Sequence, residues 1–209
     1  MSHVNVKCSL EGSERSTLIR IRSAELAENY LVEFEEMFTD RQFGANSPPN
    51  TPRPQLTVSG TQVEVYFSPD DGTMERVIDL VEEAQQSVIF MAFSFTDDDL
   101  AAAIIEKAGS GLNVTGVLEK SQALSNKGGE YENLLKNGIA VRLDGNPASM
   151  HHKVIIIDDK VVVTGSYNFS NSAKTRNDEN TLIIHNPGIA AQFMEEFERV
   201  WLEAQDQSQ

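Results

Sequence analysis

The sequence predicts an α/β fold in which a mixed β-sheet is sandwiched between helices. Strand-like and helix-like segments alternate from residue 58 to residue 209. The apolar runs, such as 88–93 and 154–157, have the length of strands and are too short to cross a bilayer. Hydrophobic residues make up 40% of the 209 residues, which is enough for one packed domain with an appendage.

Each element of this alternation has a local reason. Apolar residues at helical spacing predict a helix over 74–86, and an acidic start predicts another over 97–107. Pro187 stands at the favoured first turn of a helix that runs to about residue 204. The remaining elements are a short helix at 129–136 and strands at 63–67, 88–93, 113–118, 139–143, 153–157, 161–164 and 180–184.

A stretch rich in proline divides the chain. Residues 44–53 read GANSPPNTPR, which cannot continue a helix, so 44–57 are expected to form a linker. The linker separates an N-terminal strand-helix segment, residues 1–43, from the main domain at 58–209.

The N-terminal segment resembles the end of the chain. Shifted by 163 residues, 18–38 align without a gap on 181–201, and both stretches indicate a strand, a turn and an amphipathic helix. Two interpretations stay open. Either two amphipathic helices resemble each other by chance, or residues 1–43 are the tail of an earlier copy of the same domain.

Composition narrows the class of protein. The formal net charge of -15 gives no long-range attraction to polyanions, although an enzyme with a locally basic pocket remains compatible with it. Cys8 is the single cysteine, so an internal disulfide and a cysteine-based zinc site are excluded. With no apolar run of signal-peptide or membrane-spanning length, we expect a cytoplasmic protein without a transmembrane anchor.

Residues that carry chemistry begin at the strand 153–157. His151, Lys153 and Asp158 fit the pattern H-x-K-x4-D. Because residues two apart on a strand share a face, His151 and Lys153 are expected to project into one pocket. His152 is expected to lie on the opposite face.

The following strand ends in a second polar group. It closes with Gly-Ser-Tyr-Asn, in which Ser166 and Asn168 are again two apart and are expected to face the same pocket. Such a set suits a phosphodiester, because an ammonium and an amide can hold its anionic oxygens while a neutral imidazole attacks phosphorus. A second histidine must protonate the leaving oxygen, and Glu179 is placed to orient His151. The scheme needs no metal and no cofactor.

This motif resembles that of the phospholipase D superfamily. Residues 58–209 are most similar to its small single-motif members, the compact bacterial endonucleases and the mitochondrial cardiolipin hydrolase group. The resemblance implies His151 as nucleophile, Lys153, Ser166 and Asn168 as phosphate ligands, Glu179 as the carboxylate that orients the histidine, and Asp158 as a structural or supporting carboxylate of the catalytic set.

Structural alternatives exist for single residues. His151 by itself is compatible with a hydrogen-bonded surface histidine, and Asp158 with an ordinary turn residue. Asn168 is compatible with a turn cap, and Glu179 with a solvated charge at a strand edge.

The resemblance also implies a partner. Such enzymes bring two signatures to one site, and this chain has one, so we expect a homodimer with the active site at its interface. Alternatively, a missing upstream half supplies the second H-x-K-x4-D copy.

Three functions are compatible with the sequence. Hydrolysis of nucleic acid by an endonuclease-like enzyme is expected first, and hydrolysis of phospholipids, including cardiolipin, is the alternative. A polar segment at 121–130, expected at the pocket rim, argues against the lipid substrate. A non-catalytic phosphate-binding or assembly domain is the third possibility.

Overall fold

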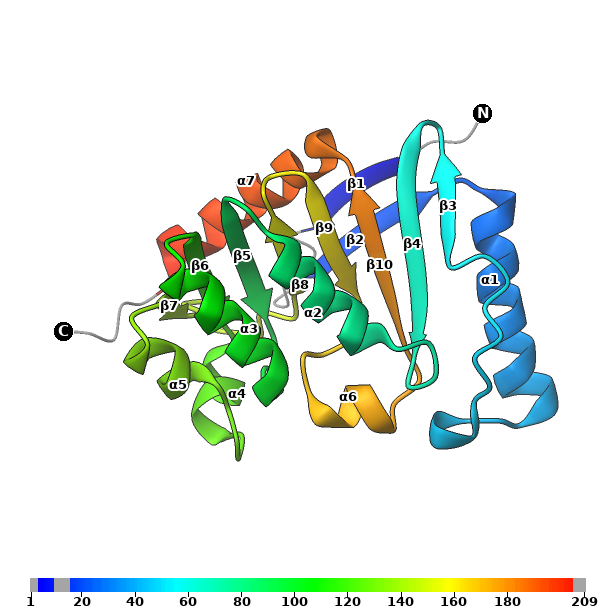
Figure 1. The fold of residues 1–209 in the computed structure, drawn as a ribbon, viewed down its shortest axis with the longest axis horizontal. Coiled ribbons are helices and arrows are strands. Elements are labelled where there is room, and N and C mark those ends of the chain that lie inside the picture. The colour runs from blue at the N-terminus through cyan, green and yellow to red at the C-terminus, as the bar shows by residue number, and fades with distance from the viewer. Residues whose placement is uncertain (1–3, 10–15, 205–209) are drawn as a thin grey trace.

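A computed structural model describes residues 4–9 and 16–204. Its centre is one large mixed sheet (Figure 1). The strands are β3 (Gln55–Val58), β4 (Thr61–Ser68), β5 (Ser87–Ala92), β6 (Asn113–Leu118), β7 (Ala140–Leu143), β8 (Lys153–Ile157), β9 (Val161–Gly165) and β10 (Glu179–His185). They are ordered β3-β4-β10-β9-β8-β5-β6-β7, antiparallel up to β5 and parallel from β5 to β7.

Helices cover both faces of this sheet, which confirms the predicted fold class. One face carries α2 (Thr73–Glu83), α3 (Asp98–Gly109) and α5 (Tyr131–Lys136), and the other carries α7 (Pro187–Glu203). The short helices α4 (Lys120–Ser125) and α6 (Asn171–Thr175) follow β6 and β9. Among the described residues, no helix has the length and apolarity that crossing a bilayer requires.

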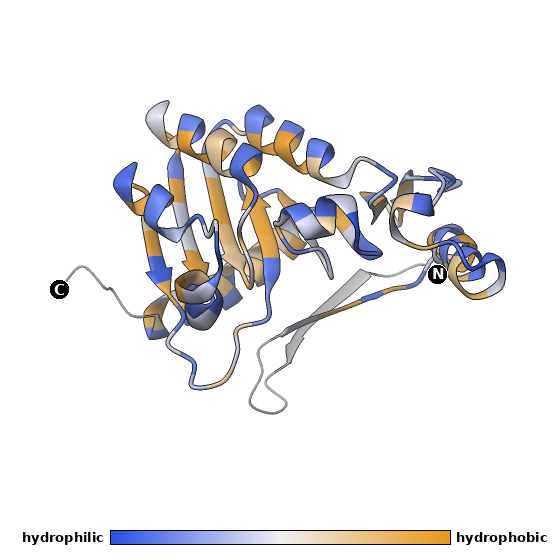
Figure 2. Cartoon of the chain, turned by 90° about the horizontal axis from the view of Figure 1, so that it is seen from below, coloured by the Kyte–Doolittle hydropathy of each residue, from blue (hydrophilic) through white to orange (hydrophobic). Residues whose placement is uncertain are grey.

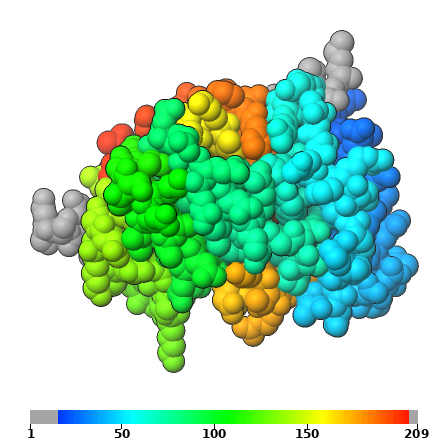
Figure 3. Space-filling view, in the orientation of Figure 1, coloured from blue at the N-terminus to red at the C-terminus, as the bar shows by residue number. Residues whose placement is uncertain are grey.

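The N-terminal segment adds a hairpin and a helix to this core. The strands β1 (Val4–Ser9) and β2 (Ser16–Ile21) pair antiparallel, and the hairpin shares a face of the sheet with α7. The helix α1 (Ala24–Glu35), prolonged by η1 (Glu36–Asp40), packs beside the β4 edge. In the space-filling view the blue N-terminal residues lie directly against the cyan edge of the sheet (Figure 3).

Strand β8 is buried on both faces. Ile155 and Ile157 pack into the cluster under α2 and α3, whereas Val154 and Ile156 pack into the cluster under α7. Figure 2 shows this apolar colouring along the central strands, between the helical layers. Apolar side chains cover both faces of β8, so polar residues can reach solvent only at the two ends of the strand. Functional groups are therefore expected at those ends.

The prediction of a linker over residues 44–57 was wrong for residues 55–57. Gln55–Val58 forms β3, which pairs with β4 through a turn at Ser59 and Gly60, both with positive φ. The alternating burial of this strand is the pattern of an edge strand with one face covered. A run of four residues beside a proline-rich stretch is too short to be recognised as a strand from the sequence. Helix α4 likewise occupies part of the segment expected to be a polar loop at 121–130.

The two segments that resemble each other in sequence also have the same order of elements and the same helix caps. Under the same 163-residue shift, the N-cap Ser23 of α1 falls on the N-cap Asn186 of α7, and each side chain accepts from the backbone N–H three residues later. Burial differs, however. Phe197 is 6% exposed against the sheet, whereas its counterpart Phe34 is 53% exposed. That residues 1–43 descend from an earlier copy stays a prediction.

Asp158 closes the end of β8 that lies away from His151. Its carboxylate accepts hydrogen bonds from the backbone N–H groups of Gln85, Gln86 and Ser87, at 2.7–3.2 Å. Burial raises its pKa, but these three donors outweigh that effect, and the pKa lies below the ordinary value. The carboxylate therefore ties the turn after β8 to the chain entering β5.

We expect Asp158→Asn to lower the free energy of unfolding by about 1 to 3 kcal/mol, because three donors lose a charged acceptor. Asparagine tolerates the positive φ of this position, 53°. Since the folded pKa is depressed, the difference from the native protein should be full at neutral pH and vanish as pH falls through that pKa. Urea unfolding at several pH values measures it, and Asp159→Asn, at an exposed neighbour, is the matched control. Equal stability of the two variants would contradict this role.

Candidate active site

A pocket of about 710 Å³ opens where β8 begins, β9 ends and β10 begins. It brings together five of the six residues predicted from the sequence. They are His151, Lys153, Ser166, Asn168 and Glu179.

The His151 ring is positioned by the end of β5. Phe93 lies edge-on to it, with ring centroids 4.5 Å apart and planes at 75°. The backbone N–H of Phe93 donates to the carbonyl of His152 at 2.8 Å, which joins the end of β5 to the residue before β8. The imidazole itself is exposed to solvent, so a substrate can reach it.

Lys153 is the buried cation of the pocket. It is 6% exposed, its ammonium donates to the His151 carbonyl at 3.1 Å, and it lies 4.8 Å from the centre of the Phe93 ring. Burial lowers the pKa of Lys153 to about 8, against the opposing charge of Glu179. An ammonium held in this way is favourably placed for an anion, which would replace the hydration lost on burial.

Ser166 and Asn168 add neutral polar groups. The Ser166 hydroxyl oxygen accepts from the backbone N–H of Asn180 at 3.0 Å and from its side-chain amide at 3.2 Å. Oδ1 of Asn168 is buried without a hydrogen-bond partner among the described residues. Glu179 accepts from the amide of Asn177 at 3.3 Å. These groups surround the space in front of Lys153 and His151.

Asp158 does not line this pocket, so it lies apart from the other five predicted residues, in the position of a structural carboxylate. It stands at the other end of β8, and its contacts there are with backbone N–H groups. The segment 121–130 is also not among the lining residues, so the polar rim expected there is misplaced. The polarity of residues 121–130 therefore does not disfavour a lipid substrate.

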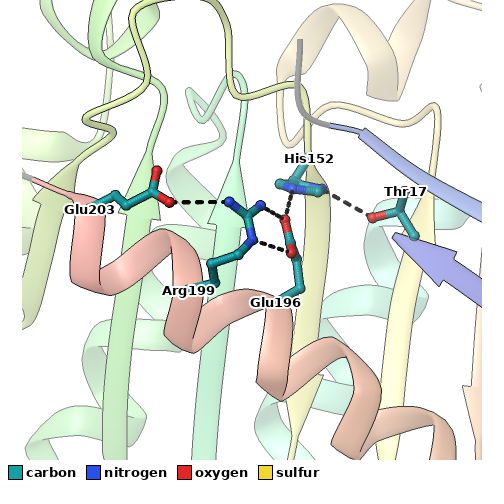
Figure 4. Close-up of polar contacts among 5 residues, drawn as sticks. All are labelled: Thr17, His152, Glu196, Arg199 and Glu203. Atoms are coloured by element: carbon teal, nitrogen blue, oxygen red, sulfur yellow. Dashed lines mark hydrogen bonds and ion pairs between the residues drawn. The ribbon is translucent and has the colours of Figure 1, made fainter. Parts of the chain in front are cut away.

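His152 has a network of its own (Figure 4). It is 1% exposed and bonds toward α7, with Nε2 3.0 Å from Glu196 and Nδ1 3.0 Å from the hydroxyl of Thr17. It nevertheless also lines the pocket, which the alternation did not predict. Burial alone would raise the pKa of Glu196, but hydrogen bonds from His152 and Arg199 lower it to about 2. The network joins the start of β8 to α7 and to β2.

Residues of the N-terminal segment were missed by the sequence reasoning. Ser16, Thr17, Leu18 and Ile19 of β2 line the pocket, together with Tyr30 of α1. The repeat indicated a strand and a helix there, but a local pattern carries no information on where such a segment packs. No group of three or more potential metal ligands occurs among the side chains that the structure describes.

Comparison with known protein families identifies the main domain. The family model described as "Cardiolipin synthase, PLD-like domain" matches residues 77–201. This range contains every residue of the predicted motif.

Curated relatives agree with this match. A mitochondrial cardiolipin hydrolase of Chlamydomonas reinhardtii is 30% identical over 65% of this chain and 60% of its own length. A phospholipase D of Rickettsia bellii is 32% identical over 70% of this chain and 75% of its own. The chain therefore spans less than two thirds of the length of the Chlamydomonas relative.

Solved structures show the same fold. Nuc of Salmonella typhimurium, a phospholipase D family member, superposes with a TM-score of 0.66 at 32% identity and covers 70% of this chain and 97% of its own. Phosphatidylserine synthase of Haemophilus influenzae gives a TM-score of 0.68 at 16% identity, with 92% of this chain covered and 56% of its own. The chain thus belongs to the phospholipase D superfamily.

Proposed function

We propose that this protein is a metal-independent phosphodiesterase that works through a covalent phosphohistidine on His151. The observation that supports it is the meeting of an accessible imidazole, a buried ammonium and the polar side chains of Ser166 and Asn168 in one pocket. Phosphate binding alone would not require a histidine beside the lysine.

The reaction has two displacements at phosphorus. A ring nitrogen of His151 forms a bond to phosphorus while the bond to the leaving oxygen breaks, and that oxygen takes a proton from a second histidine. Water then attacks the phosphohistidine, giving up a proton to the second histidine, and releases His151. Lys153, Ser166 and Asn168 hold the non-bridging oxygens as their charge changes, and Glu179 orients the nucleophile.

The second histidine must come from outside the described chain. His152 borders the pocket, but its ring nitrogens lie 3.0 Å from Glu196 and 3.0 Å from the Thr17 hydroxyl, so both are already engaged. His185 bonds Glu64 at the far end of β10, at 2.6 Å, and His3 lies outside the described residues. A symmetric homodimer or an upstream half with its own signature would supply the missing group.

The outer face of α1 favours the upstream half. Leu31, Phe34 and Phe38 form an apolar stripe on it, each more than half exposed. In α7 the corresponding face packs on the sheet, with Phe197 6% exposed and Trp201 packed against the core cluster. The stripe on α1 has the composition of a helix made to cover a sheet, and a preceding domain of the same fold would provide that sheet.

Nucleic acid is the substrate that we propose first, on the likeness to Nuc over 97% of that chain. A phospholipid is the second candidate, because Leu18, Ile19, Tyr30 and Leu182 give the pocket a partly apolar wall. Lys153 is the one lysine or arginine among the described lining residues, which suits recognition of a single phosphodiester more than tracking of a long polyanion.

The nucleophile is tested by His151→Ala. We expect hydrolysis of an aryl phosphodiester, plasmid DNA, single-stranded RNA or cardiolipin vesicles to fall at least about 10³-fold, since no other group can form the intermediate. Activity of the native protein should be unchanged by EDTA, and rapid quenching should trap a phosphorylated His151 in mass spectra. His185→Ala, at a histidine outside the pocket, is the matched control. Activity retained in His151→Ala, or lost with EDTA, would reject the mechanism, and a native protein that cleaves none of these would favour the non-catalytic role.

The charge on Lys153 should make anion binding depend on pH. Because the pKa of Lys153 is about 8, affinity for sulfate should fall about tenfold for each pH unit above that value, as the ammonium loses its proton. Calorimetry in buffers on both sides of the pKa measures this. Lys153→Arg should bind sulfate with little dependence on pH, since a guanidinium keeps its proton. A flat profile in the native protein would contradict the assignment.

The need for two signatures is tested on separated species. Light scattering coupled to size exclusion, with an assay of each fraction, should find hydrolysis in dimers or in complexes with a second signature-bearing domain. The monomer should be inactive, because neither of the other described histidines, His152 and His185, can serve as the acid for the leaving oxygen. An active monomer would contradict both the homodimer and the upstream-half proposals.

A further inference from the structure

We infer that Tyr30 is a positioning residue of the active site, which through Asn180 directs the Ser166 hydroxyl proton into the pocket. The inference rests on the proposed function, in which Ser166 holds a phosphate oxygen. Tyr30 belongs to α1, outside the residues matched by the family model.

Three side chains form a continuous chain of hydrogen bonds. The Tyr30 hydroxyl donates to Oδ1 of Asn180 at 3.3 Å. Nδ2 of Asn180 donates to the Ser166 hydroxyl oxygen at 3.2 Å, and the backbone N–H of Asn180 donates to the same oxygen at 3.0 Å. All three residues line the pocket.

The arrangement leaves Ser166 one way to interact with a substrate. A hydroxyl has two acceptor positions and one donor. Both acceptor positions of Ser166 are taken by Asn180, so its proton is the part left for the pocket. An anionic phosphate oxygen requires such a donor.

Tyr30 decides between the two orientations of the Asn180 amide. If the amide turned over, Oδ1 would face Ser166 and accept its proton, and the substrate would lose that donor. The turned amide would also leave the proton of the Tyr30 hydroxyl without the acceptor that Oδ1 now provides. A partly buried donor without an acceptor is unfavourable, so the tyrosine favours the orientation that frees Ser166.

The structure holds Tyr30 firmly in place. Its ring meets Phe67 of β4 edge-on, with centroids 5.1 Å apart. The preceding residue, Asn29, is fully buried and bonds the backbone of Arg53 in both directions, at 2.7 and 3.0 Å. Burial raises the pKa of Tyr30 to about 12, so its hydroxyl remains a donor throughout the neutral range.

A double-mutant cycle of Tyr30→Phe and Ser166→Ala tests the inference. Tyr30→Phe keeps the ring against Phe67 and removes the hydroxyl, and we expect kcat/KM and sulfate affinity to fall about 3- to 10-fold. Ser166→Ala should reduce both about 10- to 100-fold, because a donor to an anion is lost. In the Ser166→Ala background, Tyr30→Phe should have no further effect, since no proton remains to be directed.

The control is Tyr66→Phe, which removes a hydroxyl bonded to Glu64 outside the pocket and should leave kcat/KM and sulfate affinity unchanged. Equal factors for Tyr30→Phe in both backgrounds, or no effect in the native background, would overturn the positioning role. Sulfate calorimetry decides this even for a protein that hydrolyses nothing. Failure of the proposed function is recognised separately, by activity that survives His151→Ala.

Discussion

Pairing of β8 with β5 and β9 is the constraint on which the catalytic edge depends. The strand is buried on both faces, and its backbone is bonded on both sides. The Phe93 N–H donates to the His152 carbonyl and so extends the pairing by one residue before β8. Backbone hydrogen bonds alone therefore fix the segment that carries the motif. His151 and Lys153 then take their positions from a rigid strand, which is how sites achieve precise geometry.

Electrostatics at this edge are set by burial more than by the total charge. The formal net charge of the chain is -15. The Lys153 ammonium is nevertheless buried where few groups compensate for its lost hydration. Elsewhere, nearby hydrogen-bond donors stabilise acidic side chains. Asp158 accepts from three backbone N–H groups, and Glu196 lies between His152 and Arg199. A strongly acidic chain can therefore contain a pocket that favours anions, because each charge interacts mainly with its immediate neighbours.

The meeting of five predicted residues in one pocket was predictable because they lie on adjacent strands joined by short turns. Two-residue spacing placed His151 with Lys153 and Ser166 with Asn168, and the turn between β8 and β9 is local. Asp158 lies away from the pocket because a motif gives order along the chain and not direction in space, and five residues of strand separate it from His151. Strand β3 was hidden by the neighbouring prolines. The contributions of Thr17 and Tyr30 depend on packing across more than a hundred residues, for which one sequence offers no local signal.

The wall formed by β2 and α1 has an evolutionary consequence. It belongs to a segment joined to the domain through the proline-rich stretch, while the proposed nucleophile and phosphate ligands lie at the ends of strands of the main sheet. Substitutions in that segment can change the wall of the pocket while the strands that carry His151 and Lys153 stay in place. Relatives that share the sheet can therefore differ in what the pocket accepts, within the limit that Tyr30 sets through its contact with Asn180.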